Sequence, residues 1–359
     1  MNAAFYMREA LNFAKFSIGL SRPNPAVGAV VVRDGKIVGK GRTQAPGSAH
    51  AEVCALREAG ELANGADIYV TLEPCCHFGR TPPCTSAIIA AKIKRVFFAH
   101  ADPNPIVRGN SSKVLEEAGI EVFEGVEACG DTSEGACVFE DVERYFEGYD
   151  YFVRNKAVFV EIKSAVTKNF KMANADRTPM RITGELANCW THNLRSISDA
   201  ILVGASTVVH DNPSLNVRLC EGNSPVKIVL ANETQLSKNA KVFADGKTIV
   251  YSCVVQQALA GIAECLLLPS RDFRENWQFI LADLSARGMH RLMVEPGATL
   301  AKLIFETGLW NRFDLWIASH ESEGLEFPMY VAMLGKTTLA LEKAFGEDLL
   351  KVYRNAERA

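Results

Sequence analysis

Two short segments of the chain hold the residue types that a catalytic metal site needs. The first reads HAEVCAL at residues 50–56, and the second reads TLEPCCHFGRTPPC at residues 71–84. Imidazole nitrogen and thiolate sulfur are preferred ligands of Zn²⁺, and three such ligands leave the fourth tetrahedral position open for a water. A carboxylate beside that water can accept its proton and pass it on. The two segments therefore predict a hydrolytic zinc centre.

The first segment supplies one ligand and one acid. We expect His50 to bind the metal and Glu52 to shuttle the proton as the catalytic residue. Residues two apart lie roughly 200° around an ideal helix, so the two side chains converge only if His50 stands at the very start of a helix. Gly47 and Ser48 just upstream provide a plausible cap region.

The second segment offers more candidate ligands than one ion can use. Cys76 directly follows Cys75, and neighbouring side chains point apart, so one ion rarely binds both. Cys84 stands directly before the apolar run 85–94, where the N-terminus of a helix would stabilise a thiolate. We therefore predict Cys75 and Cys84 as the second and third ligands, and we expect Cys76 and His77 to lie near the site without binding the metal.

A purely structural zinc site is the alternative. Structural sites are closed by four ligands, usually in Cys-x-x-Cys pairs, and the sequence contains no such pair. Three ligands with an acid nearby favour catalysis. His-x-Glu followed by Pro-Cys is typical of zinc-dependent base deaminases.

The elements that must position these residues follow from the hydrophobic pattern. AVGAVVV and KIVGKG flank Asp34-Gly35, a strong hairpin signal, and strand and helix patterns then alternate to about residue 125. This order predicts a mixed sheet with helices on both faces. Residues 126–150 are acidic and aromatic and suggest a helical connection, with a domain boundary near Gly148. We expect one domain at 1–147 and a second α/β domain at 148–359.

Composition limits the partners. The formal net charge is −3 and the sequence pI is about 6.2, which gives no reason to expect a nucleic acid. No apolar run reaches the roughly 20 residues of a membrane span, and the N-terminus lacks the pattern of a secretory signal. We expect a cytoplasmic homo-oligomer that acts on a small molecule, with its ten cysteines mostly reduced.

Six motifs together resemble one known family. PNPAVGAVVV, HAEVCAL, TLEPCCHFGRTPPC and ADPNP occur in this order, and ISDAILVGASTVVHDNPSLNVR and VEPGATLAKLIFETGLW follow. In these motifs the chain is similar to the bifunctional enzymes of riboflavin biosynthesis, which are diaminohydroxyphosphoribosylaminopyrimidine deaminases and 5-amino-6-(5-phosphoribosylamino)uracil reductases. The long spacer between the two cysteines is particular to that family among zinc deaminases. The resemblance covers nearly the whole chain.

The resemblance implies two consecutive reactions. A domain similar to the cytidine-deaminase fold would remove the 2-amino group of 2,5-diamino-6-ribosylamino-4(3H)-pyrimidinone 5′-phosphate with zinc. A domain that resembles dihydrofolate reductase would then reduce the ribosyl group to a ribityl chain with NADPH. The absence of G-x-G-x-x-G agrees with a fold other than the Rossmann fold.

The resemblance also implies binding residues. In the deaminase, Asn24 would hydrogen-bond the pyrimidine. In the reductase, the implied substrate-binding residues are Pro179, Arg195, Leu215, Arg218 and Glu295, and the implied cofactor-binding residues are Ala165, Arg181, Thr207, Asp211, Asn232, Gly297, Ala298 and Thr299. Guanidinium groups suit phosphate oxygens, and a strand–Gly–helix turn presents backbone N–H groups to an anion.

The chain departs from the family pattern at several positions. Val166–Asn169 stands where Ser-Leu-Asp-Gly is usual, Arg181 where tryptophan is common, Ala231 where aspartate is frequent and Thr43 where histidine is frequent. These changes leave open a monofunctional zinc deaminase with a non-catalytic reductase-like second domain. An RNA- or DNA-directed base editor is a third hypothesis, which the charge balance disfavours.

Overall fold

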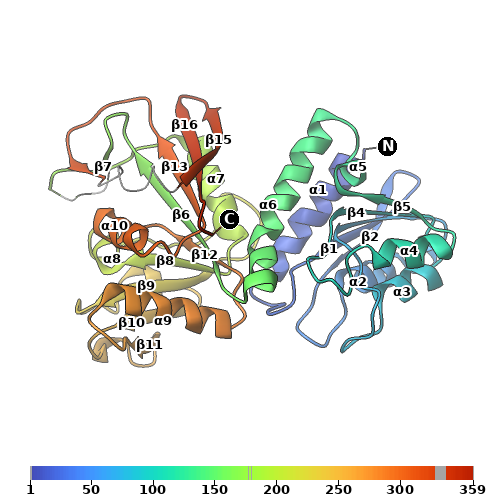
Figure 1. Ribbon diagram of the computed structural model, residues 1–359, viewed down its shortest axis with the longest axis horizontal. Helices are drawn as coiled ribbons and strands as arrows, with labels where there is room; N and C mark the ends of the chain where they lie inside the picture. The colour runs from blue at the N-terminus through green and yellow to red at the C-terminus, as the bar shows by residue number, and fades with distance from the viewer. Residues whose placement is uncertain (1, 177, 179, 328–336, 359) are drawn as a thin grey trace. The chain divides into compact units, whose positions relative to one another are not determined.

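The computed structural model describes residues 2–176, 178, 180–327 and 337–358. It divides into two compact units, Met1–Lys156 with Glu221–Asn223, and Ala157–Cys220 with Ser224–Ala359. Both units are α/β, as Figure 1 shows. The expected boundary near Gly148 lies inside helix α6 (Ser133–Asn155), which ends at Lys156 with φ 54°. The helix runs on because Phe146 is buried beside His100 of the first unit, so it completes that unit's core.

The first unit is built on a mixed five-stranded sheet. Its strand order is β2-β1-β3-β4-β5, with β1 antiparallel to both neighbours and β3, β4 and β5 parallel. The elements besides α6 are α1 (Ala3–Ala14), η1 (Lys15–Ser17), β1 (Gly28–Arg33), β2 (Lys36–Arg42), α2 (Ala51–Ala59), η2 (Gly60–Ala63), β3 (Asp67–Leu72), α3 (Cys84–Ala90), β4 (Arg95–His100), α4 (Asn110–Glu117), β5 (Glu121–Glu124) and α5 (Gly125–Cys129). Helices α1, α5 and α6 cover one face, and α2, α3 and α4 cover the other (Figure 1). The mixed sheet with helices on both faces is confirmed.

The predicted hairpin forms the edge of this sheet. Asp34 and Gly35 have φ of 50° and 74°, the left-handed pair that a tight two-residue turn requires. Two glycines of β2 then allow α2 to approach the sheet closely. A Cβ atom on Gly39 would lie 2.2 Å from the carbonyl oxygen of Ala55, and one on Gly41 would lie 1.9 Å from that of Ala51. Helix α2 is therefore seated directly on the backbone of β2.

The second unit contains a nine-stranded sheet with the order β11-β10-β9-β8-β12-β6-β13-β16-β15. The first seven strands in this order, from β11 at the edge to β13, are parallel to one another. Strands β16 and β15 form a hairpin that pairs antiparallel with β13. Its elements are β6 (Phe159–Val166), β7 (Lys171–Ala173), α7 (Glu185–Ser196), β8 (Ala200–Gly204), α8 (Ala205–Asp211), β9 (Val226–Asn232), η3 (Lys241–Phe243), β10 (Thr248–Ser252), η4 (Gln257–Leu259), β11 (Glu264–Leu267), α9 (Phe273–Ala286), β12 (Arg291–Val294), α10 (Ala298–Thr307), β13 (Arg312–Ile317), β14 (Leu325–Glu326), β15 (Thr337–Phe345) and β16 (Asp348–Asn355).

Hydrophobic residues fill both faces of this second sheet. On one face Trp277 and Ile280 of α9 and Ile304 of α10 pack on β6, β12 and β13. On the other face side chains of α7 and α8, among them Leu194 and Val208, join smaller clusters. The α/β class predicted for this half is confirmed. None of the ten cysteines forms a disulfide. None of the helices in the described ranges is long and apolar enough to cross a membrane.

Candidate functional site

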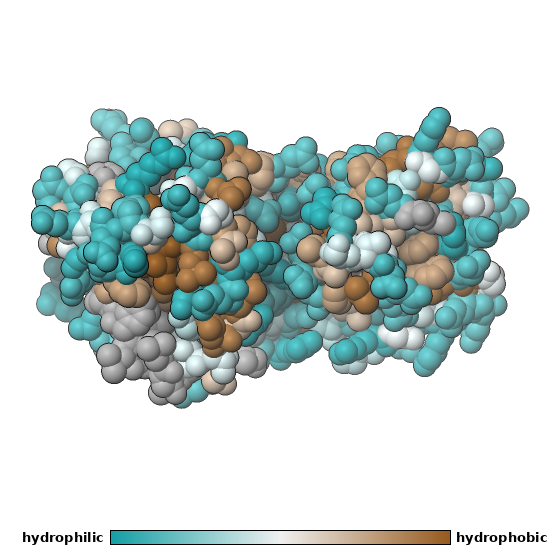
Figure 2. All heavy atoms as spheres, turned by 90° about the horizontal axis from the view of Figure 1, so that it is seen from above, coloured by the Kyte–Doolittle hydropathy of each residue, from teal (hydrophilic) through white to brown (hydrophobic). Residues whose placement is uncertain are grey.

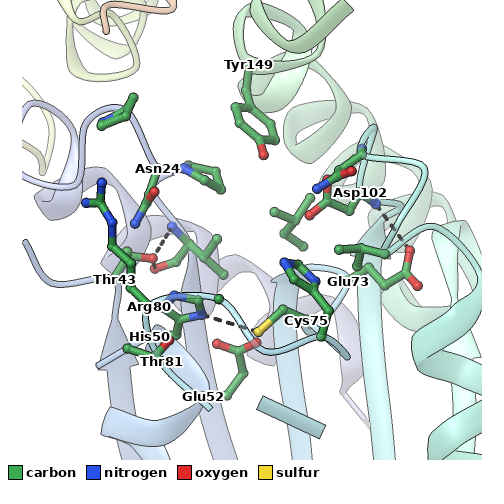
Figure 3. A pocket seen from close by; sticks show the side chains of 18 of the residues that line it. Asn24, Thr43, His50, Glu52, Glu73, Cys75, Arg80, Thr81, Asp102 and Tyr149 are labelled. Carbon is green, nitrogen blue, oxygen red and sulfur yellow. Dashed lines mark hydrogen bonds between the residues drawn. The ribbon is translucent and has the colours of Figure 1, made fainter. Parts of the chain in front are cut away.

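The start of helix α2 places the predicted acid and the predicted imidazole side by side. His50 is the N-cap residue with extended backbone, φ −75° and ψ 168°, and Glu52 lies in the first turn. Because His50 precedes the helical backbone, its side chain turns toward Glu52 instead of diverging from it, as Figure 3 shows. Glu52 is only 4% exposed. The geometry expected from the sequence is present.

The two predicted thiol ligands reach the same point from the segment after β3. Cys75 lies in the loop and Cys84 is the first residue of α3. The Sγ atoms of Cys75 and Cys84 lie 3.5 and 3.3 Å from Nδ1 of His50. Among the described residues this is the one group of three or more His, Cys, Asp or Glu side chains with ligand atoms all within 4.8 Å of one another.

These distances fit a tetrahedral zinc ion. Bonds of about 2.0–2.3 Å at tetrahedral angles separate two ligand atoms by roughly 3.5 Å. The backbone N–H of Cys84 donates to Sγ of Cys75 over 3.3 Å, which orients that sulfur. The thiol of Cys76 instead faces the carbonyl oxygen of Ile106 at 3.8 Å, and His77 lies outside the cluster.

The ionisation of the cluster suits metal binding and proton transfer. The hydrogen bond from the Cys84 thiol is the largest cause that lowers the pKa of Cys75, to about 4, and His50 adds to it. The same hydrogen bond and burial raise the pKa of Cys84. Burial, followed by the Cys75 thiolate, raises the pKa of Glu52 to about 7. A carboxyl group with a pKa near neutrality can both accept and donate a proton.

A cavity of about 350 Å³ opens above this cluster. Figure 3 shows Asn24 projecting into it from the loop before β1. Thr43, which stands where the family often has histidine, lines the same wall and accepts a hydrogen bond from the N–H of Val27 over 3.0 Å. The remaining lining residues are Pro23, Pro25, Val27, Gly47, Leu72, Glu73, His77, Gly79, Arg80, Thr81, Asp102, Asn104, Val107 and Tyr149.

Glu73 holds one wall of the cavity in place, although sequence reasoning assigned it no role. Its carboxylate accepts the N–H of Asp102 over 3.3 Å and the N–H of Gly109 over 2.9 Å. Glu73 is 3% exposed. The loop that it holds carries Asp102 and Asn104 into the cavity. A lone glutamate in a strand end gives no sequence signal for this long-range contact.

The structure also places Tyr149 in the cavity wall. This residue lies in α6, and Figure 3 shows its hydroxyl pointing into the cavity from the side opposite His50 and Glu52. Sequence reasoning treated the segment as a connection between domains and assigned it no functional residue.

In the second unit four of the five predicted substrate residues are described, and all four lie together. Arg195 of α7 forms a two-pronged ion pair with Glu295, with Nε and Nη2 at 2.9 and 3.0 Å from the carboxylate oxygens. Burial alone would raise the pKa of Glu295, but Arg195 lowers it overall. Arg195, Leu215 and Arg218 line a cavity of about 270 Å³. Pro179 lies outside the described residues.

The predicted cofactor residues gather mostly at the carboxyl ends of neighbouring parallel strands. Thr207 lies in α8 after β8, Asn232 ends β9, and Gly297 caps α10 after β12. A Cβ atom on Gly297 would lie 3.9 Å from Oγ1 of Thr207. Neither α8 nor α10 has a side chain hydrogen-bonded at its N-cap, so backbone N–H groups remain available for a pyrophosphate. Ala298 and Thr299 open α10, and Asp211 ends α8.

Two predicted cofactor residues lie elsewhere on the same domain. Ala165 is near the end of β6 and packs beside Trp190, Trp316 and Phe345. Arg181 lines a separate hollow of about 470 Å³ with Phe345 and His320. Their assignment to the cofactor stays a prediction.

Two lysines near the second cavity escaped the sequence reasoning. Lys163 of β6 pairs in register with Asp314 of β13. Burial lowers its pKa, while Glu295 counteracts this effect. Lys241 lines the cavity of Arg195 and Arg218. Single lysines in a strand or a polar loop are too common to signal a site.

Comparison with known families divides the chain as the structure does. Residues 1–100 match the model for the cytidine and deoxycytidylate deaminase zinc-binding region. Residues 158–320 match the model for the RibD C-terminal domain. The predicted fold classes of both halves are confirmed.

Curated relatives span both halves. The chain is 39% identical to the riboflavin biosynthesis protein RibD of Aquifex aeolicus over 318 residues, which covers 87% of this chain and 86% of that protein. It is 33% identical to RibD of Escherichia coli, covering 89% of this chain and 88% of that protein.

Solved structures agree over the full length. A diaminohydroxyphosphoribosylaminopyrimidine deaminase/5-amino-6-(5-phosphoribosylamino)uracil reductase from Thermotoga maritima is 32% identical, with a TM-score of 0.75 and 98% of each chain covered. RibD of Acinetobacter baumannii is 29% identical, with a TM-score of 0.71 and 99% of each chain covered.

Proposed function

This chain belongs to the RibD family of riboflavin biosynthesis, a bifunctional deaminase and reductase, and we propose that it works with zinc in its first domain and NADPH in its second. The relatives cover both halves, so the bifunctional hypothesis is favoured over a deaminase with an inactive second domain. We propose the domains as 1–147 and 148–359, with α6 contributing its side chains to the first. The substrate is a small phosphorylated pyrimidine.

The deaminase proposal is carried by the cluster of His50, Cys75 and Cys84 beside Glu52. These three side chains would hold a zinc ion, which would lower the pKa of a bound water toward neutrality. Glu52 takes the proton from the attacking water and delivers it to the leaving amine, so that ammonia departs and a carbonyl remains. Asn24 holds the pyrimidine against this centre through hydrogen bonds from its amide.

The reductase proposal is carried by the cavity beside the Arg195–Glu295 pair. NADPH supplies the hydride. The backbone N–H groups at the N-termini of α8 and α10 would hold its pyrophosphate. Two N–H donors of Arg195 are already bonded to Glu295. The positive charge that binds the substrate phosphate therefore comes from Arg218 and Lys241. Glu295 faces the ribosyl group.

We also propose a homo-oligomer, which the exposed sheet edge supports. Among the strands of the described residues, β15 is the last of its sheet, and its residues from Thr338 to Ala344 are all exposed. The surface in Figure 2 is mostly hydrophilic, with hydrophobic side chains in separate patches. On β15, two hydrophobic residues are exposed to solvent, Leu339 to 51% and Leu341 to 39%. A long edge strand with apolar side chains is a template for pairing with a second chain. Light scattering after gel filtration measures the mass directly, and a monomeric mass would contradict this proposal.

The decisive experiment for both activities uses the purified protein. Incubation with 2,5-diamino-6-ribosylamino-4(3H)-pyrimidinone 5′-phosphate should release ammonia, and addition of NADPH should then lead to its oxidation. Ammonia release without NADPH oxidation would support the monofunctional alternative. Elemental analysis should find one zinc per chain, and active protein without zinc would contradict the proposed centre.

A further inference from the structure

We propose that Tyr149 is a substrate-binding residue of the deaminase, whose hydroxyl hydrogen-bonds the ribosyl part of the substrate. This inference depends on the proposed deamination. It concerns a residue of α6, a helix that begins beyond the region shared with cytidine deaminases, residues 1–100.

The position of Tyr149 determines which part of the substrate it meets. The leaving amino group must lie beside Glu52, at the cluster of His50, Cys75 and Cys84. In Figure 3 the hydroxyl of Tyr149 enters the cavity from the opposite side, next to Asp102. The leaving amine is attached to C2 of the ring, C5 lies directly across from it, and C6 beside C5 carries the ribosylamino group. The sugar therefore extends from the half of the ring that lies away from the leaving amine. Tyr149 therefore faces the group that a simple base lacks.

Helix α6 holds this tyrosine firmly through the residues on either side of it. The hydroxyl of Tyr145 donates to the carbonyl of Ala26 over 2.9 Å. Phe146 is buried and stacks on the ring of His100 with 5.0 Å between centroids. His100 in turn bonds Asp150 over 2.9 Å. Tyr149 itself packs edge-on against Phe146 at 6.4 Å. A side chain fixed in advance loses little entropy when it binds a ligand.

The chemistry of this wall suits sugar hydroxyls. Burial raises the pKa of Tyr149, and the charge of Asp102 raises it further. The phenol is thus a neutral donor at any physiological pH, beside the carboxyl group of Asp102. A phenol that can donate and accept, next to a carboxyl oxygen that can accept, matches hydroxyl groups that do both.

The test compares two ligands in one variant. Tyr149→Phe keeps the ring that packs on Phe146 and removes only the hydroxyl. One neutral hydrogen bond contributes about 0.5–1.5 kcal/mol. We expect KM for the full phosphoribosyl substrate to rise about 2- to 13-fold, with kcat and zinc content unchanged. The sugar-free triaminopyrimidinone base, measured as a competitive inhibitor of deamination, should keep its inhibition constant.

Tyr151→Phe is the matched control. It makes the same change in the same helix, and Tyr151 lies about 200° around the helix from Tyr149 and does not line the cavity. Its KM should equal that of the wild type. An unchanged KM in Tyr149→Phe, or an equal weakening of the sugar-free base, overturns the inference. Failure of the wild-type protein to release ammonia would instead refute the proposed deaminase itself.

Discussion

The two cysteines of the candidate zinc centre are held in different ways. Cys84 is buried at the first position of α3, while Cys75 lies in the preceding loop and receives the N–H of Cys84. Cys76, although adjacent to Cys75, faces the carbonyl of Ile106 instead. The direction of each side chain, rather than its place in the chain, therefore decides which sulfur can reach His50.

This difference gives a direct test of the ligand set. Cys84→Ser should lose bound zinc and deaminase activity, because a neutral hydroxyl replaces a thiolate ligand. Cys76→Ser should keep one zinc per chain and most of its activity. Zinc content measured by mass spectrometry, with ammonia release, checks both variants. Loss of zinc from Cys76→Ser alone would show that the ligand choice is wrong.

The sequence was sufficient for residues whose chemistry is local. Sequence reasoning grouped His50, Glu52, Cys75 and Cys84 because residue types that bind metals have few alternatives and characteristic spacings. The structure places these side chains together, and their roles as ligands and acid stay a prediction. Tyr149 could not be predicted, nor could Glu73, Lys163 and Lys241. Each of these side chains reaches its site only through tertiary contacts, and its residue type is common on any protein surface. For Arg195 and Glu295, the resemblance to the family located the pair, but their mutual neutralisation appears only in the structure.

Among the elements, α2 depends most on its contact with the sheet. Gly41→Ala would introduce a Cβ atom 1.9 Å from the carbonyl oxygen of Ala51, which forces the helix away from β2. Overpacking of this kind costs about 1–3 kcal/mol. We expect a lower free energy of unfolding in urea and reduced deamination, because His50 and Glu52 move with α2. Lys36→Ala, at the exposed start of β2, should change stability by less than about 0.5 kcal/mol.

A second prediction concerns the contact between β4 and α6. Burial would lower the pKa of His100, but its bonds to Asp150 and Glu143 outweigh this and raise it to about 9 from 6.5. A raised pKa means that this contribution to stability is complete below pH 6.5 and disappears as the pH rises through about 9. One pKa unit is worth about 1.4 kcal/mol, so we expect a loss of about 1–3 kcal/mol. Urea unfolding of the wild type and of His100→Gln, each measured at pH 6.5 and at about pH 9, checks this prediction. The wild type should lose stability between the two pH values, and the variant should not.

The order of strands and helices could be predicted well where hydrophobic periodicity was strong. The hairpin of β1 and β2 and the alternation of strands and helices up to β5 agree with the sequence. Strands β7, β11 and β14 were missed because they are short. Strand β15 was missed because it is almost wholly exposed and shows no buried alternation. Strand β16 was also missed, although its residues alternate between buried and half-buried. The predicted boundary near Gly148 falls within α6, which continues without a break residue to Asn155, and it stays a prediction.

For the molecule as a whole, two separate active centres imply two independent activities. Glu52→Gln should lower ammonia release by a factor of about 10²–10⁴ while zinc stays bound and NADPH oxidation with the deaminated intermediate is unchanged. Arg218→Ala should raise KM of the reduction about 10- to 100-fold, as expected for a lost charge-assisted phosphate contact, and leave deamination intact. Steady-state kinetics of each step on both variants checks this, and loss of both activities in either variant would argue against separate centres.

Gly39 and Gly41, which have no Cβ atom, also limit how this enzyme could be redesigned. Because α2 lies directly against the backbone of β2, the part of the cavity that α2 forms cannot move without displacing His50, the proposed metal ligand at the start of this helix. A change of substrate range must therefore be introduced from above, through the loop after Cys76 or through α6. Libraries aimed at those segments would keep the reactive centre intact, whereas libraries aimed at β2 would mostly yield inactive protein.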